Sequence, residues 1–226
     1  KTKVLTSRIA HIIKEKKAFP NQILSVTFTN KAAKEMQSRV SAILDSGAIG
    51  LSWLGTFHSI CAKLLRKHAP AAGLTSNFTI IDTDDQVRLI KNICKAESID
   101  IKQLAPKYIL SIIDRWKNKG FYPSEVIISK NDIFEKTILP LYRVYQQKLL
   151  DLNACDFGDL ILHVVKILER NLDIREIYSN NFKYILVDEY QDTNYIQSRW
   201  LYLLSEKHKN LCCVGDDDQS IYSWRG

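Results

Sequence analysis

The sequence predicts an α/β fold built on a parallel β-sheet and interrupted by a helical insertion. Short apolar runs that end in polar residues alternate with amphipathic helices, which is the pattern of parallel strand–helix units. The run YILV at residues 184–187 is continuously hydrophobic, as expected of a strand buried on both faces. Residues 82–155 show successive helical patterns without this alternation, so we expect them to interrupt the α/β part, residues 1–81 and 156–226.

Composition and charge narrow the class of protein. No apolar run approaches the roughly 20 residues that span a bilayer, and no signal-peptide pattern is present, so we expect a cytoplasmic protein without a membrane partner. The net charge is +7, but residues 1–81 carry +9, residues 82–155 carry +2 and residues 156–226 carry −4. A basic first third and an acidic last third suit a site that joins phosphates to a carboxylate-held metal.

The first elements predict two strand–helix units. Lys1-Thr2 leads into a helix whose apolar stripe is Val4, Leu5, Ile9, Ile12 and Ile13, and Lys-Ser/Thr followed by a helix is how a phosphate-binding loop ends. A strand over residues 23–29 then precedes a helix that begins near Asn30. Phe28 and Asn30 therefore fall at the ligand-binding edge of the sheet, although ordinary core packing is the alternative for Phe28.

The second unit is a strand over residues 53–57 that runs into a helix. Thr56, His58 and Ser59 would lie at the amino end of this helix, where they can donate hydrogen bonds to a phosphate backbone; a simple helix cap is the alternative for His58. A third strand, NFTIID at residues 77–82, is expected to close this portion of the chain.

The insertion holds one feature that points toward nucleic acid. Trp116, Lys117 and Lys119 form a small aromatic and basic cluster near the end of a predicted helix. Two interpretations stay open, a nucleic-acid contact and a solvated helix end.

The α/β pattern resumes at Asp156, which is expected to cap a helix with Asp159 in its first turn. Strand 184–187 then ends in Asp188 and Glu189, which are placed to hold Mg²⁺ and to accept a proton from water. An acidic turn after a core strand is the alternative. A helix with Trp200 follows, and then a last strand, whose Cys212 and Cys213 are expected to be reduced core residues.

Taken together, the motifs resemble the first motor domain of the UvrD/Rep/PcrA-type superfamily I DNA helicases. They stand in that family's order and spacing: KT at 1–2, TFTNKAAKEM at 27–36, GTFHS at 55–59, VDEYQDTN at 187–194 and VGDDDQSIYSWRG at 214–226. The resemblance implies a RecA-like P-loop NTPase domain (1A) of residues 1–81 and 156–226, incomplete at both ends. Residues 82–155 then correspond to the family's helical subdomain (1B). Position 158 departs from the family, with glycine where relatives commonly carry aspartate.

The resemblance also implies a nucleotide site. Lys1 would contact the β and γ phosphates of ATP, and Thr2 and Asp188 would hold Mg²⁺. Glu189 would orient or deprotonate the attacking water, and Gln219 would sense the γ phosphate.

A track for single-stranded DNA is implied as well. It would be lined by Phe28, Asn30, Thr56, His58, Tyr222, Trp224 and Arg225. Aromatic faces stack on any base, each worth roughly 1 to 3 kcal/mol, so a motor built this way binds without reading sequence.

The implied function is ATP-dependent, 3′ to 5′ translocation on single-stranded DNA and at single-strand/duplex junctions, in bacterial DNA repair or replication. Partners from those pathways are expected. The 226 residues alone are expected to hydrolyse ATP negligibly, because they include neither the glycines of the phosphate loop nor a second motor domain with its arginines. Two alternatives stay open: a non-catalytic module that binds single-stranded DNA or a partner, and the helicase half of a helicase-nuclease.

Overall fold

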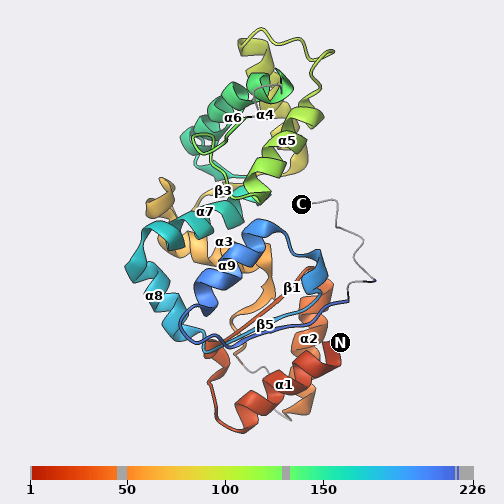
Figure 1. Cartoon of the computed structure of the whole chain (residues 1–226), viewed down its shortest axis with the longest axis vertical. Coiled ribbons are helices and arrows are strands. Elements are labelled where there is room, and N and C mark those ends of the chain that lie inside the picture. The colour runs from red at the N-terminus through yellow and green to blue at the C-terminus, as the bar shows by residue number, and fades with distance from the viewer. Residues whose placement is uncertain (1, 45–49, 129–132, 217, 219–226) are drawn as a thin grey trace.

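The chain folds into an α/β unit with a helical lobe at one end. The computed structural model describes residues 2–44, 50–128, 133–216 and 218 (Figure 1). In Figure 1 the lobe lies at the top, helices α1 and α2 lie at the bottom, and the sheet lies between them under α3, α7 and α9. Within the described ranges, no helix combines the length and the apolar character that crossing a membrane requires.

The main sheet confirms the parallel α/β prediction. Four strands run in the order β2-β1-β5-β6, all parallel. Their bounds are β1 Ile23–Thr27, β2 Leu54–Thr56, β5 Tyr184–Val187 and β6 Leu211–Cys213. Val26 pairs with Val187 and Val187 pairs with Cys213, so the strands end level with one another. Every residue that follows a strand therefore reaches the same edge of the sheet.

Alternation along the strands divides the core between the two faces of the sheet. Ile23 and Leu186 point toward α1 (Thr2–Lys14) and α2 (Asn30–Ile43). Leu24 and Val187 face the opposite layer. That layer consists of α3 (Phe57–His68), α7 (Phe157–Arg170) and α9 (Tyr195–Ser205). Because both faces are covered, β5 reads as an apolar run in the sequence, and all five residues of β1 are buried, including the polar Ser25 and Thr27.

Several details differ from the sequence-based expectations. Helix α8 (Leu172–Asn181) was not predicted; two of its ten residues, Tyr178 and Ser179, are buried, so it has little apolar periodicity. Val4 is 62% exposed although its stripe-mates on α1 are buried or half-buried. Cys213 is exposed and Cys212 half-buried, because β6 is the edge strand among the described residues. The expectation of a core position was therefore wrong for Cys213, whereas Cys212 packs against the core on the side of α1 and α2.

The strand predicted to close the first portion pairs away from the main sheet. β3 (Thr79–Ile80) forms a two-stranded parallel ladder with β4 (Ala154–Cys155). β4 lies at the end of the range that was expected to be mostly helical, and it was not predicted. Asn153 reinforces this ladder, since its side chain accepts a hydrogen bond from the backbone N–H of Thr75 at 2.9 Å and donates to the Thr75 hydroxyl at 2.6 Å.

Between these two short strands lies the helical lobe. It contains α4 (Thr83–Ala96), α5 (Pro106–Asn118) and α6 (Ile133–Asp151), which pack around a core of their own. Short 3₁₀ turns at Pro20–Gln22, Ala69–Ala72 and Tyr190–Asp192 complete the described elements.

Both interpretations of the aromatic and basic cluster fail for two of its three residues. Trp116 is 4% exposed and stacks on Tyr142 in the core of the lobe. Lys117 is fully buried, and its Nζ lies 2.6 Å from Oδ2 of Asp156 and 2.7 Å from Oδ1 of Asp159. Helical periodicity alone does not distinguish a buried, paired lysine from a solvated one. Lys119 is exposed, as a solvated helix end would be.

A buried histidine also lies close to one of these aspartates, Asp159. His163 on α7 is 3% exposed; its Nε2 lies 3.9 Å from Oδ1 of Asp159, and its Nδ1 lies 2.6 Å from the Tyr122 hydroxyl. Burial lowers the pKa of His163, and the Asp159 carboxylate only partly opposes this. His163 is therefore neutral in the fold at pH values where an unfolded histidine takes up a proton.

This shift predicts a pH dependence of stability. Below a pH of about 6.5, the pKa of an unfolded histidine, His163 takes up a proton in the unfolded chain but stays neutral in the folded one. The free energy of unfolding therefore falls as the pH drops below about 6.5. Urea unfolding at pH 7, 6 and 5 should show that His163→Gln loses less stability than the parent, by up to about 1.4 kcal/mol per pH unit. The exposed His208, changed to Gln, is the control, and parallel curves for parent and His163→Gln would contradict the prediction.

Candidate functional site

The acidic end of β5 meets the start of the first helix. The hydroxyl of Thr2 donates a hydrogen bond to Oδ2 of Asp188 at 3.0 Å, although the two residues are 186 positions apart. Asp188 is 2% exposed, and its backbone N–H is fixed by the carbonyl of Val26 on the neighbouring strand. The sheet register and helix α1 therefore bring a hydroxyl and a carboxylate to one point.

These two side chains suit a magnesium ion. Burial raises the pKa of Asp188, more than the hydrogen bond from Thr2 lowers it, so a cation beside the carboxylate would relieve the cost of its charge. Mg²⁺ prefers oxygen ligands and is usually bound by one or two carboxylates together with substrate phosphates. In the described part of the chain no group of three or more His, Cys, Asp or Glu side chains could hold a metal by itself. The donor set therefore fits Mg²⁺ bound jointly with a phosphate ligand.

Glu189 stands next to this pair in an unusual backbone conformation. Its φ of 54° and ψ of 45° are left-handed, which costs a non-glycine residue of order 1 to 3 kcal/mol. The side chain is fixed by Gln191, whose Nε2 donates to Oε2 of Glu189 at 2.6 Å. Such strain is kept where the position of a side chain matters.

Gln191 also reaches the segment after β6. Its Oε1 accepts a hydrogen bond from the backbone N–H of Asp216 at 2.9 Å. A Cβ on Gly215 would lie 2.7 Å from that same oxygen, so only glycine permits this approach. One amide side chain thus connects Glu189 to the segment that follows β6.

Three aromatic rings pack in a row between the core and the carboxyl end of β1. Phe28, half-buried after β1, packs edge-to-face on Phe57 with ring centroids 5.5 Å apart. Phe57 in turn packs on the fully buried Trp200 at 5.8 Å. Phe28 thus packs against the core and is also partly accessible at the ligand-binding edge. The sequence had left these two positions open as alternatives.

A second pair of rings lies at the start of α3. His58 is half-buried and meets the ring of Phe157 edge-on, with centroids 5.8 Å apart. Phe157 is the first residue of α7 and is 51% exposed. An exposed aromatic residue beside a helix start is suited to base stacking.

The other two predicted DNA residues that the structure describes, Thr56 and Asn30, lie at helix starts. Thr56 is buried and caps α3, its hydroxyl accepting a hydrogen bond from the Ser59 N–H at 3.1 Å. Asn30 is exposed and begins α2, which Thr29 caps. Helices α1, α2 and α3 have no acidic residue in their first turns, so the positive ends of their dipoles are not neutralised locally. This edge is favourable for anions such as phosphates.

The sheet order separates the two groups of residues. Asp188, Glu189 and Gln191 follow β5 and connect toward β6, whereas Phe28 and His58 follow β1 and β2 on the other side. The predicted residues Lys1, Gln219, Tyr222, Trp224 and Arg225 lie outside the described residues.

Sequence reasoning did not single out two residues that the structure adds. Gln191 sits inside the acidic motif, and its role depends on a contact to Asp216 that only the fold creates. Phe157 directly follows the predicted cap Asp156. The sequence could have pointed to it, because it is an aromatic residue at the first position of a helix, where no core contact is required.

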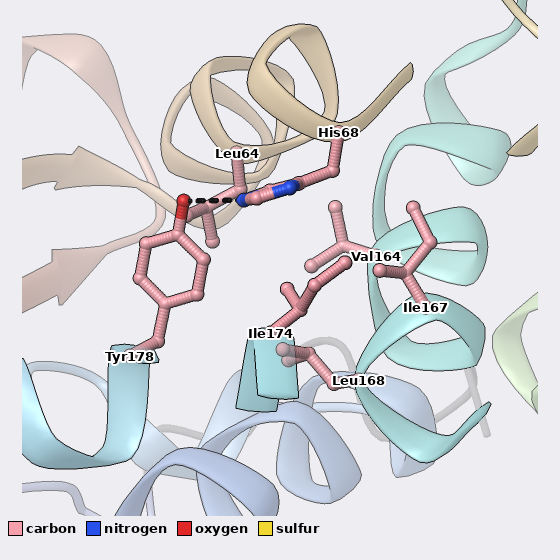
Figure 2. A pocket seen from close by; sticks show the side chains of 7 residues that line it. All are labelled: Leu64, His68, Val164, Ile167, Leu168, Ile174 and Tyr178. Atoms are coloured by element: carbon pink, nitrogen blue, oxygen red, sulfur yellow. Dashed lines mark hydrogen bonds between the residues drawn. The ribbon is translucent and has the colours of Figure 1, made fainter. Parts of the chain in front are cut away.

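A small cavity between α3, α7 and α8 is not this site. Figure 2 shows it lined by side chains from all three helices, with the Tyr178 hydroxyl joined to the His68 ring at 2.8 Å. Its volume of about 10 Å³ holds at most one water molecule. It lies against α8, which precedes the amino end of β5, and so belongs to the opposite end of the sheet from Asp188.

Comparisons with known proteins agree with this geometry. The model of the UvrD/REP helicase N-terminal domain matches residues 1–226. A probable DNA helicase II homolog of Rickettsia conorii is 48% identical over the whole chain, which covers 35% of that relative. The ATP-dependent DNA helicases PcrA of Staphylococcus epidermidis and Bacillus subtilis are 46% and 45% identical, with 31% and 30% of their lengths covered.

The chain thus spans about a third of the length of these relatives. It is matched by the family model from end to end, and its parallel α/β fold is the one expected of that domain. The chain belongs to the UvrD/REP helicase family and corresponds to the N-terminal domain of that family.

Proposed function

We propose that this chain is the ATP-binding motor domain of a DNA helicase that moves 3′ to 5′ along single-stranded DNA. The observation that carries the proposal is the 3.0 Å hydrogen bond from Thr2 to Asp188 at the carboxyl end of β5, with exposed aromatic residues at the same sheet edge. The names of the relatives, DNA helicase II and ATP-dependent DNA helicase PcrA, agree with it. Residues 1–81 and 156–226 would form the motor part (1A), and residues 82–155 the helical subdomain (1B).

The nucleotide would lie with its phosphates over the start of α1. Thr2 and Asp188 would hold Mg²⁺, with Lys1 on the β and γ phosphates; the bound ion would neutralise phosphate charge in the transition state. Glu189 would accept the proton of the attacking water, and its hydrogen bond to Gln191 keeps the carboxylate in one orientation. Gln219 would sense the γ phosphate.

Single-stranded DNA would cross the β1 and β2 side of the same edge. Phe28, His58 and Phe157 offer ring faces and edges to bases, and the helix starts that carry Asn30 and Thr56 offer donors to the phosphate backbone. Tyr222, Trp224 and Arg225 would extend this surface. The partners would be single-stranded DNA and single-strand/duplex junctions in the cytoplasm of a bacterium, together with proteins of repair or replication.

The nucleotide site predicts a specific loss in Asp188→Asn. Affinity for a fluorescent ATP analogue, measured by titration with Mg²⁺, should fall about 10- to 100-fold, because one charge-assisted interaction is lost. Asp173→Asn, an exposed carboxylate on α8, is the control and should bind as the parent does. Affinity that Asp188→Asn leaves unchanged, or binding that EDTA does not weaken, would contradict the assignment.

The aromatic surface predicts sequence-independent binding of single strands. Phe28→Ala and Phe157→Ala should each weaken binding of a labelled oligo-dT, followed by fluorescence anisotropy, by about 5- to 150-fold, and oligo-dC should respond alike. Phe134→Ala is the matched control, because Phe134 is 59% exposed but lies in the helical lobe. Equal losses in Phe134→Ala and Phe157→Ala would argue against a defined track.

The contacts of Gln191 predict a local change in dynamics. In Gln191→Ala the Asp216 amide loses its acceptor, and its hydrogen exchange should quicken roughly fivefold, the equivalent of about 1 kcal/mol. Gln147→Ala serves as the control, because it removes an exposed hydrogen bond from the Gln147 side-chain amide to the Asp151 carboxylate on α6. If the exchange rate at Asp216 stays at the parent value, Gln191 does not hold this segment.

A further inference from the structure

The helical lobe is joined to the α/β unit by a buried ammonium group. Lys117, in the last turn of α5, projects onto the first turn of α7 and lies between two carboxylates, Asp156 and Asp159, that are themselves buried. Burial disfavours the ammonium, but the two carboxylates outweigh it and raise the pKa of Lys117, so the side chain stays charged. The contact is therefore an ion triad between two parts of the fold.

Both carboxylates also build the start of α7. Oδ1 of Asp156 accepts the N–H of Asp159 at 2.9 Å, and Oδ2 of Asp159 accepts the N–H of Asp156 at 3.2 Å, which is a reciprocal capping box. The other oxygen of each carboxylate faces Lys117. Asp156 and Asp159 thus both cap α7 and bind Lys117.

Another helix of the lobe, α6, also contacts the two aspartates. The Tyr145 hydroxyl donates to Asp156 at 2.9 Å and the Gln146 side-chain amide donates to Asp159 at 2.9 Å, both from α6. Gly158 makes room for the lysine: a Cβ there would lie 3.0 Å from Cδ of Lys117, closer than ordinary contact. Glycine at this position lets the Lys117 stem lie directly against the turn.

Phe157 lies between the two carboxylates in sequence and points the other way. It is 51% exposed and meets His58 edge-on, while its neighbours Asp156 and Asp159 are at most 1% exposed. A turn whose two acidic residues are held by Lys117 has little freedom to rotate. The direction of the exposed ring is therefore set from the lobe, through the first turn of α7.

We propose that Lys117 is a positioning residue for single-stranded DNA: it holds the Asp156–Asp159 capping box so that Phe157 stands beside His58 and stacks on a base. The inference rests on the proposed function. It makes the helical lobe part of the DNA site without requiring the lobe to touch the strand, since a shift of α5 is passed to Phe157 through two carboxylates.

A double-mutant cycle tests this with the 226-residue chain and labelled oligo-dT. Lys117→Met should weaken binding about as much as Phe157→Ala, roughly 5- to 150-fold. In the Phe157→Ala background the effect of Lys117→Met should vanish, whereas in the Phe28→Ala background it should persist in full. A loss of structure alone would lower affinity equally in both backgrounds.

Lys166→Met is the matched control. Lys166 also ties the chain after α5 to α7, through Glu125 at 2.9 Å, but about two turns beyond the capping box, so this variant should bind as the parent does. If Lys117→Met fails to fold by circular dichroism, the triple variant Lys117→Met/Asp156→Asn/Asp159→Asn takes its place. Asparagine still caps a helix, and no charge of the triad remains buried.

The outcomes separate the two proposals. Binding by Lys117→Met at the parent level, or an equal loss in both backgrounds, overturns the positioning role and leaves the proposed function standing. A parent chain that binds no oligo-dT overturns both. The role assigned to Lys117 is supported if the effect of Lys117→Met on binding is non-additive with Phe157→Ala but additive with Phe28→Ala.

Discussion

The structure depends on a sheet whose strands are parallel and in level register. Parallel strands require crossover connections, and helices on both faces supply them here, so the strand residues are buried and every loop after a strand emerges at one edge. Thr2, Phe28, Thr56 and Asp188 come from distant parts of the chain yet share that edge. The site is thus a consequence of topology, and the side chains at strand ends only specify its chemistry.

Much of this was predictable, because the signals are local. The run at residues 184–187 marks a buried strand, and the acids that follow it must emerge where that strand ends. Asp156 followed three residues later by Asp159 marks a helix start, and the structure has that capping box. The carboxyl-edge placement of Asn30 and His58 followed from strand–helix alternation in the same way. In each case neighbouring residues carry enough information to fix backbone direction.

The parts that escaped prediction depend on contacts between distant residues. Lys117 looked like a surface or DNA-contacting lysine, because sequence does not show that two buried carboxylates 39 and 42 positions later would receive it. The pairing of Gln191 with Asp216 needs the β5–β6 register. Helix α8 buries too little apolar surface to leave a periodic pattern, and the exposure of Cys213 follows from the place of β6 in the strand order.

The β3–β4 ladder has a consequence for how such a chain can change over evolutionary time. It holds Ile80 and Cys155 side by side, so the chain leaves the α/β unit and returns to it at one place. A segment whose two ends coincide can be lengthened, shortened or exchanged with little change in loop-closure cost, because that cost grows only with the logarithm of length. The helical lobe is in this sense a replaceable module, and the triad around Lys117 is the feature that a replacement would have to reproduce.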